Sequence, residues 1–257
     1  MIIKDIHLNK AIGIPPSGIN GNPPSGDPGY HQIISTISHE LRTPVATIKS
    51  NIQLLRKFSY HMEGAILEES FSLCEESVDD VARFLDNIQL LNSVNKSRVH
   101  PVYSSFRTKS IIHHLYTWLD QMNLDYHRIE LKWDLKDLVI ISDKKYLSLV
   151  VINLLSNALK FSKKKVKCVI RTYHHELSIM VQDWGIGIPE QEIEMIFQPF
   201  CRASNVTHIS GIGLGLAIVQ AMVENLGGKI QVSSTIEKGT IFHILIPYET
   251  SKQNSCH

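Results

Sequence analysis

The feature that most constrains the fold of this chain is an apolar stripe that repeats every seven residues near its N-terminal end. The positions that carry it are Ile34, Leu41, Ile48 and Leu55, with Ile37 on a matching second seam. Such spacing predicts a helix over about residues 30–61 that turns one face toward a partner helix. Counting outward from the stripe places His39 on the opposite, solvent-facing side, beside Glu40. A histidine of this kind is usually ordinary surface, and it also suits a nucleophile or phosphoryl acceptor, so the helix alone leaves both interpretations open.

A second stripe predicts another long helix after a turn near Gly64. Its apolar positions alternate steps of four and three residues: Leu67, Phe71, Cys74, Val78, Val81, Leu85 and Ile88. Two such helices form a hairpin, which has too little core to stand alone. We therefore expect a homodimer in which two hairpins pair into a four-helix bundle. The alternative is that the stripe packs on another domain of the same chain.

Composition and charge exclude several classes of protein. With 257 residues the chain can form one large domain or two small ones, and its formal net charge of +1 gives no reason to expect nucleic acid as a partner. No apolar run approaches the roughly 18 to 20 residues that cross a bilayer, and the start of the chain lacks a signal-peptide pattern. We expect a cytoplasmic protein with no membrane segment. The four cysteines have no metal-ligand spacing, and we expect Cys74 and Cys168 to be buried thiols.

The pattern of the chain divides it into four segments. Residues 1–29 contain Pro-Pro-Ser-Gly twice and are expected to be a disordered tail. Residues 30–98 form the helical segment, residues 99–248 a mixed segment, and residues 249–257 a C-terminal tail. Within the mixed segment the patterns predict helices over 111–122, 145–161 and 216–226 and strands over 130–134, 139–142, 166–173, 177–182, 229–233 and 240–247. This order favours a helix layer on one face of a mixed sheet.

Three polar side chains share one face of the otherwise apolar helix at 145–161. Asn153, Asn157 and Lys160 are four and three residues apart. Two amide oxygens and an ammonium group suit a magnesium ion and the phosphates that it bridges. The same residues would also suit a helix face turned to solvent, and the helix alone does not decide between the two.

Two glycine-containing segments add to this picture. Asp183 follows a predicted strand and precedes Gly185 and Gly187, so its carboxylate could accept a hydrogen bond from an exocyclic amine such as that of adenine; a simple tight turn is the alternative. Residues 211–215 read Gly-Ile-Gly-Leu-Gly directly before the third helix, where bare backbone N–H groups favour phosphate. Taken alone, this glycine run is a weak signal.

In their order along the chain, these segments closely resemble the catalytic core of sensor histidine kinases of two-component systems, over about residues 30–248. The histidine box is Ser38-His39-Glu40-Leu41-Arg42-Thr43-Pro44, and the others are an asparagine box at 153–161, a first glycine box at 183–189, a phenylalanine box at 197–202, a second glycine box at 211–215 and a final turn at 239–242. Trp184, Cys201 and Glu237 depart from the commonest family pattern, and none of them is a catalytic position.

The resemblance implies a fold and an activity. The fold is a helical hairpin that forms a dimeric four-helix bundle, followed by a Bergerat-type α/β sandwich that binds ATP, as in gyrase, Hsp90 and MutL. The activity is ATP-dependent autophosphorylation of His39, with Mg²⁺ as cofactor, and transfer of the phosphoryl group to an aspartate of a separate response regulator, together with phosphatase activity toward that regulator. A separate sensor protein is a further expected partner.

The resemblance also implies roles for individual residues. His39 is the phosphorylated residue, Glu40 its acid/base partner, and Thr43 the residue that orients water in dephosphorylation. Asn157, helped by Asn153, is the expected magnesium ligand. The other expected nucleotide-binding positions are Lys160, Phe161, Asp183, Gly185, Gly187, Ile188, Phe200, Arg202, Gly211, Gly213, Leu214, Gly215, Leu216 and Thr240, with residues 195–210 as a lid over the nucleotide.

Two other classes of function compete with this reading. One is a non-kinase ATPase of the same nucleotide-binding fold, and the histidine box argues against it. The other is a non-catalytic dimeric scaffold or phosphatase, and retention of Asn153, Asn157, Lys160 and Asp183 argues against that. A further hypothesis concerns Pro44: because proline has no N–H, the carbonyl of Glu40 loses its helical partner, and the helix is expected to bend there.

Overall fold

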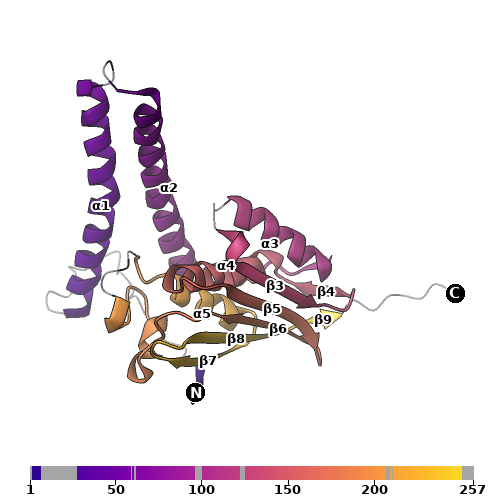
Figure 1. Ribbon diagram of the computed structural model, residues 1–257. Helices are drawn as coiled ribbons and strands as arrows, with labels where there is room; N and C mark the ends of the chain where they lie inside the picture. The colour runs from indigo at the N-terminus through magenta and orange to yellow at the C-terminus, as the bar shows by residue number, and fades with distance from the viewer. Residues whose placement is uncertain are drawn as a thin grey trace, which may run out of the picture. The chain divides into compact units, whose positions relative to one another are not determined.

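The structure, a computed structural model, describes residues 2–6, 28–58, 60, 62–95, 100–121, 125–206, 209 and 211–250. The chain separates into two compact units, one within residues 13–90 and the other made of residues 1–12 together with 91–257. Figure 1 shows the first as a pair of long helices and the second as a sheet with helices packed on it. Each unit is described by itself.

The helical unit is the predicted hairpin. Helix α1 spans Pro28–Phe58 and helix α2 spans Gly64–Asn95. The two helices pack through the predicted seam: Leu41, Ile48 and Leu55 are half-buried, and the Cys74 thiol lies 3.9 Å from the Ile48 carbonyl oxygen. On α2 the buried hydroxyls of Ser70 and Ser77 donate to carbonyls four residues earlier, which satisfies them without a partner helix.

The apolar stripe predicted on α2 is divided between two faces. Leu67, Cys74, Val81 and Ile88 are half-buried, whereas Phe71, Val78 and Leu85 are exposed in this single chain. The three exposed residues follow one another at intervals of seven, so they form their own line along the helix. The hairpin therefore satisfies only part of its apolar surface internally.

The second unit is built on a mixed sheet, as predicted, and this sheet has six strands. The strand order is β1-β7-β8-β6-β5-β3, and all neighbours are antiparallel except β3 and β5. The bounds are Ile2–Ile6 for β1, Lys229–Thr235 for β7, Gly239–Pro247 for β8, Glu176–Gln182 for β6, Val166–Tyr173 for β5 and Ile129–Asp134 for β3. A smaller sheet has the order β2-β4-β9, with bounds Ser104–Arg107, Val139–Ser142 and Glu249–Thr250.

Three helices, α3 (Lys109–Gln121), α4 (Lys144–Phe161) and α5 (Gly215–Asn225), lie on one face of the large sheet (Figure 1). Short 3-10 turns span Tyr126–Arg128, Glu190–Glu192, Met195–Phe197 and Ser204–Val206. Helix α4 is the centre of the core, because its apolar side chains are almost all buried. Its first turn is capped by Asp143, whose carboxylate accepts from Tyr146 N–H at 2.9 Å and from Val102 N–H at 2.7 Å.

The C-terminal end of α4 is held by one arginine. The guanidinium of Arg128 donates to the carbonyls of Leu159, Ser162 and Lys164. These include carbonyls that the end of a helix leaves without an internal partner. Asp143 and Arg128 together therefore fix both ends of the helix that carries the polar face at Asn153 and Asn157.

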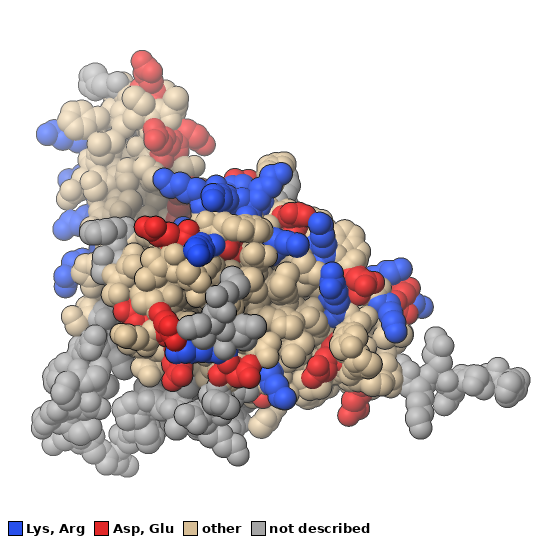
Figure 2. Space-filling model, turned by 60° about the horizontal axis from the view of Figure 1, so that its bottom comes forward, with Lys and Arg blue, Asp and Glu red and all other residues tan. Residues whose placement is uncertain are grey.

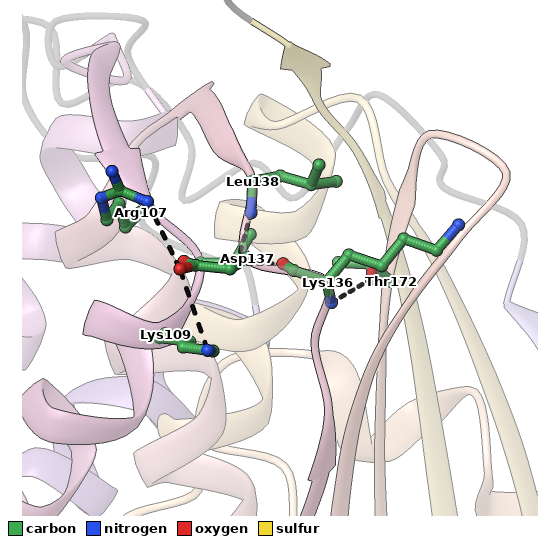
Figure 3. Close-up of polar contacts among 7 residues, drawn as sticks. Arg107, Lys109, Lys136, Asp137, Leu138 and Thr172 are labelled. Atoms are coloured by element: carbon green, nitrogen blue, oxygen red, sulfur yellow. Dashed lines mark hydrogen bonds and ion pairs between the residues drawn. The ribbon is translucent and has the colours of Figure 1, made fainter.

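A polar cluster joins the small sheet to the large one (Figure 3). The Asp137 carboxylate lies 3.3 Å from Arg107 and 3.8 Å from Lys109, and Lys136 N–H donates to the Thr172 hydroxyl on β5 at 3.1 Å. Because Arg107, Lys109 and Asp137 are exposed, these ion pairs contribute little to stability, and the backbone contact of Lys136 is the more specific link.

The tail prediction is wrong at residues 2–6. These residues form β1, which pairs antiparallel with β7 at the edge of the large sheet. Residues 28 and 29, also expected as tail, belong to α1, which begins at Pro28, two residues before the predicted start. Residues 7–27, the rest of the expected tail, lie outside the described residues. At the other end, Glu249 and Thr250, also expected as tail, form β9, and residues 251–257 lie outside the described residues.

None of the helices in the described part of the chain combines the length and the apolar character needed to cross a membrane. On the face drawn in Figure 2, basic and acidic side chains both occur, and the formal net charge of the chain is +1.

Candidate functional site

The polar face of α4 lies against the second glycine segment. A Cβ at Gly215, the first residue of α5, would lie 3.1 Å from Asn153 Oδ1 and 3.7 Å from Asn157 Nδ2. A Cβ at Gly211 would lie 2.1 Å from Lys160 Nζ. The structure therefore brings together two features that the sequence separates by more than fifty residues. On this face the two asparagines are half-buried and Lys160 is exposed, so the face is only partly open to solvent.

Asn153 is oriented by its own helix. Its Nδ2 donates to the Leu149 carbonyl at 2.8 Å, which leaves Oδ1 directed at the start of α5. That helix begins after Leu214 with no side-chain cap. The first N–H groups of a helix have no internal partner and favour an anion. An amide oxygen and a helix N-terminus thus share one side of the site.

Asp183 is a buried carboxylate at the end of β6, with only 7% of its surface exposed. Its N–H donates to the Thr240 carbonyl at 2.9 Å, and its Oδ1 accepts from Gly185 N–H at 2.8 Å. Burial raises the pKa of the Asp183 carboxyl, and hydrogen bonds from the backbone of Gly185 and Thr240 oppose the rise. The result is a desolvated acceptor in a fixed position.

The first glycine segment packs directly on the end of α4. A Cβ at Gly185 would lie 2.1 Å from the Phe161 carbonyl oxygen, and Ile186 N–H donates to that same oxygen at 3.3 Å. A Cβ at Gly239 would lie 2.1 Å from the Asp183 carbonyl oxygen. Only glycine allows the three chain segments to approach so closely, and this approach fixes the turn that follows Asp183 against the C-terminal end of α4.

Sequence reasoning missed Ser234. Its buried hydroxyl accepts from Ile188 N–H at 2.8 Å, lies 2.9 Å from the Thr240 hydroxyl and donates to the Gly239 carbonyl at 3.2 Å. It therefore joins two predicted positions, Ile188 and Thr240, into one wall. The sequence contains no signal for it, because Ser234 lies on a strand and belongs to none of the recognised motifs.

The expected lid is tied to the second glycine segment. Phe200 has a positive φ of 65° and its N–H donates to the Gly213 carbonyl at 3.0 Å. The guanidinium of Arg202 donates to the carbonyls of Val206 and Ile209, so in this structure it holds the lid backbone. Asn205, which the sequence did not single out, donates to the Gly187 carbonyl at 2.9 Å. Residues 207, 208 and 210 of the lid lie outside the described residues.

Leu214 is buried, and Leu216, Phe161 and Ile188 are half-buried in the same region. These positions supply apolar surface around the polar groups already described. Every predicted nucleotide-binding residue therefore belongs to the sheet unit, on or near α4, the end of β6, the two glycine segments, the lid or the start of β8.

His39 lies in the helical unit, and its predicted solvent-facing position is confirmed. Its side chain is 74% exposed, while that of Glu40 is 18% exposed, and Nδ1 of His39 lies 3.7 Å from Oε1 of Glu40. Thr43 is exposed one turn later on the same face. Helix α1 continues through Pro44 to Phe58, so the proline lies within a helix that does not end there.

Comparison with known proteins identifies both units. The model of the His Kinase A (phospho-acceptor) domain matches residues 31–96, and the model of the histidine kinase-, DNA gyrase B- and HSP90-like ATPase matches residues 142–250. The signal transduction histidine-protein kinase ArlS of Staphylococcus aureus (strain USA300) is 31% identical over 225 residues. The chain carries the catalytic core of a sensor histidine kinase. The match covers 83% of this chain and 48% of ArlS, so the kinase core spans about half the length of the curated relatives it matches.

Solved structures share the fold of this kinase core. Acinetobacter baumannii histidine kinase AdeS has a TM-score of 0.63 at 24% identity, covering 81% of this chain and 97% of that one. Histidine kinase ThkA, solved in complex with response regulator protein TrrA, has a TM-score of 0.60 at 22% identity, covering 84% of this chain and 61% of that one.

In this kinase core Gly187 lies very close to the backbone of Thr235. Two matched variants, Gly187→Ala and Gly227→Ala, test whether this close approach shapes the site. Both glycines have a φ near +70° (69° and 68°), so alanine is strained at both. A Cβ at Gly187 would lie 2.1 Å from the Thr235 carbonyl oxygen, whereas at Gly227 the nearest atom, Pro247 Cγ, is 3.7 Å away. We expect Gly227→Ala to cost about 1–2 kcal/mol of unfolding free energy from strain alone.

We expect Gly187→Ala to cost more, because the backbone must also shift away from Thr235, and to weaken ADP binding about tenfold, or about 1.4 kcal/mol. Urea denaturation and calorimetric titration with ADP measure the two effects. Equal losses of stability in both variants, with ADP affinity unchanged, would show that the close approach at Gly187 does not shape the site.

Proposed function

We propose that this chain is an ATP-dependent protein histidine kinase that phosphorylates itself on His39 and passes the phosphoryl group to an aspartate of a separate response regulator. The observation that carries the proposal is the pairing of two chemistries in one chain. The sheet unit assembles a buried carboxylate, an amide face and an open helix N-terminus, and the helical unit presents an exposed imidazole beside a carboxylate. The likeness to ArlS and to the two family models supports it.

The adenine ring is recognised by Asp183 in this proposal. The Asp183 carboxylate is desolvated and acceptor-only when ionised, so it pairs with the exocyclic amine of adenine and leaves a 6-oxo purine unpaired. Ser234 and Thr240 hold the adjoining wall through their hydroxyl contact. Selectivity for adenine then follows from the cost of leaving a buried polar group without its partner.

The residues of α4 fit a magnesium ion bound together with phosphates. Asn153 Oδ1 and Asn157 Nδ2 face the space that a Cβ at Gly215 would fill. Amide oxygens suit magnesium, so Asn153 would bind the ion as it stands, and Asn157 would do so with its amide group turned over. Among the described residues no group of three or more His, Cys, Asp and Glu side chains could hold a metal, so phosphate oxygens and water would complete the coordination. The ion would supply charge neutralisation on the phosphates. Lys160, beside Gly211, and the N-terminus of α5 bind phosphate oxygens directly.

The transfer step follows from the chemistry of His39. One ring nitrogen attacks the γ-phosphorus through its lone pair, a P–N bond forms, the bond to the bridging oxygen of ADP breaks, and ADP leaves. The other ring nitrogen keeps its proton. Glu40, at 3.7 Å, stabilises the positive charge that develops on the ring. Thr43, on the same face, orients water in the dephosphorylation of the partner regulator.

The helical unit is proposed to form a homodimer. Phe71, Val78 and Leu85 are exposed along one line of α2, and Val45 and Ile52 are exposed on α1 with the same interval of seven residues. Lines of exposed apolar side chains on long helices suit an interface between helices, and two hairpins would cover them as a four-helix bundle.

The first test concerns the phosphoacceptor. Incubated with γ-labelled ATP and Mg²⁺, the chain is expected to take up a label that is lost in acid and stable in alkali, as a phosphorus–nitrogen bond requires. His39→Gln should abolish the label and retain ADP affinity, because His39 is not part of the sheet unit. His113→Gln, which changes another exposed histidine, on α3, should leave the label intact.

ATP turnover with no label in the unmodified chain would instead favour the non-kinase ATPase. A label that persists in His39→Gln would refute His39 as the acceptor.

The second test concerns the dimer. Val78→Asp places a charge on the exposed line of α2, and Val102→Asp does so at a valine outside it; the two are 54% and 75% exposed. Sedimentation equilibrium should show a dimer for the unmodified chain and for Val102→Asp. Val78→Asp should dissociate about tenfold more readily, since a buried unpaired charge costs more than about 1.4 kcal/mol. Circular dichroism checks that its helices persist, and identical association of both variants would place the interface elsewhere.

A further inference from the structure

The strand β1 is a feature of this chain outside the recognised motifs. Its five residues form a continuous antiparallel ladder with β7, from Ile2 opposite Ser234 to Ile6 opposite Ile230. The two family models begin at residue 31 and at residue 142, so neither includes it. Residues at the start of the chain thus occupy the edge of a sheet whose other strands come from more than a hundred residues later.

Side chains on both faces of β1 make specific contacts. Lys4 Nζ donates to the Glu190 carbonyl at 3.1 Å, Ile6 is buried, and Asp5 Oδ1 accepts from Gln231 Nε2 at 2.8 Å. These are more contacts than backbone pairing alone provides, and they distinguish this docking from a general affinity of an open edge for any extended peptide.

The Asp5 contact extends across the sheet. Gln231 Oε1 lies 3.2 Å from His243 Nδ1, and His243 Nε2 lies 2.8 Å from the Ser178 hydroxyl. Burial lowers the pKa of His243, and the charge of Glu176 opposes this. With a neutral ring, Nδ1–H donates to Gln231 Oε1, so the Gln231 amide turns its NH₂ group toward Asp5. A row of side chains from β6, β8 and β7 therefore presents a donor to β1.

The contacts of β1 fall on the wall of the nucleotide site. Ile2 pairs with Ser234, whose hydroxyl binds Ile188 N–H and Thr240. Thr240 in turn accepts from the N–H of Asp183. Lys4 Nζ donates to the backbone carbonyl of Glu190, two residues after Ile188 in the same segment. The strand thus reaches both segments that position the buried carboxylate.

We propose that docking of residues 2–6 on β7 is coupled to adenine-nucleotide binding, so that the docked strand raises nucleotide affinity and bound nucleotide stabilises the docked strand. The inference rests on the proposed function, which supplies the nucleotide. The coupling is reciprocal by thermodynamic necessity. In the sequence, β1 is the element that precedes α1, the helix that carries the proposed phosphoacceptor.

The test uses the direction of the backbone groups. Asp183 N–H donates to the Thr240 carbonyl, which continues the β6–β8 register. Backbone N–H groups alternate in direction along a strand. In β7, the N–H groups of even-numbered residues therefore point toward β1. In β1, the N–H groups of even-numbered residues point toward β7. The N–H of Lys4 therefore bonds β7, and that of Ile3 faces away from it.

Lys4→Pro removes a ladder hydrogen bond, whereas Ile3→Pro places the same ring where an edge strand tolerates it. Lys4→Ala isolates the loss of the ammonium contact to Glu190. Amide hydrogen exchange at Ile230, Val232 and Ser234 reports docking, and calorimetric titration with ADP and Mg²⁺ reports the coupling. In Lys4→Pro we expect faster exchange at these three amides and ADP binding about fivefold weaker or more. Ile3→Pro should match the unmodified chain, and Lys4→Ala should fall between them.

In the unmodified chain, ADP should slow exchange at the same three amides. Unchanged exchange in Lys4→Pro would overturn the docking, and faster exchange with unchanged ADP affinity would overturn the coupling alone. Failure of the unmodified chain to bind ADP would overturn the proposed function and the coupling with it. Amide hydrogen exchange in Lys4→Pro would still show whether the strand docks. Unchanged exchange of the β8 amides in each variant shows that the sheet itself persists.

Discussion

The burial of one carboxylate, Asp183, is the constraint on which the rest of the nucleotide site depends. A charged group removed from water must be hydrogen-bonded, and here the backbone of Gly185 and Thr240 provides the donors. To do so, the turn after β6, the start of β8 and the end of α4 must lie within a few ångströms of one another. Glycines at positions 185 and 239 permit this, because any side chain there would meet backbone at 2.1 Å.

The two units of the chain place their proposed functional residues in opposite environments. The sheet unit removes Asp183 from water and gathers the amides of α4 around an open helix N-terminus, an arrangement that we propose binds an adenine nucleotide. The helical unit keeps His39 in water, as its proposed role of phosphoacceptor requires. The same helices leave apolar residues such as Val78 exposed, so the rigidity that presents the histidine is proposed to come from pairing with a second copy.

Much of this could be predicted where the signal is local. Periodicity identified the two long helices and α4, and the exposed side of α1 at His39 follows directly from counting residues. Periodicity could not tell which apolar residues of α2 are covered and which remain exposed. Phe71 and Cys74 both belong to the predicted apolar stripe, yet Phe71 is exposed and Cys74 is half-buried. Ser234 was missed because its role arises from contacts with the segment at Ile188 and with the start of β8, which meet only in the folded chain.

The strand β1 shows the same limit more sharply. Its five residues look like the start of a tail, since Lys4 and Asp5 interrupt the apolar pattern and glycines and prolines follow. Its partner β7 lies more than two hundred residues later, and a pairing at that separation leaves no local trace. Both charged residues have partners that only the folded sheet provides, Glu190 for Lys4 and Gln231 for Asp5.

Recognition of adenine by Asp183 can be measured by comparing ADP with inosine diphosphate, which carries an oxo group in place of the 6-amino group. Calorimetric titration of the unmodified chain should show a clear preference for ADP. In Asp183→Asn the preference should shrink about tenfold or more, since a hydrogen bond to a charged group is worth about 1.5–3 kcal/mol, while inosine diphosphate affinity changes little. An unchanged ratio of the two affinities in Asp183→Asn would contradict the account.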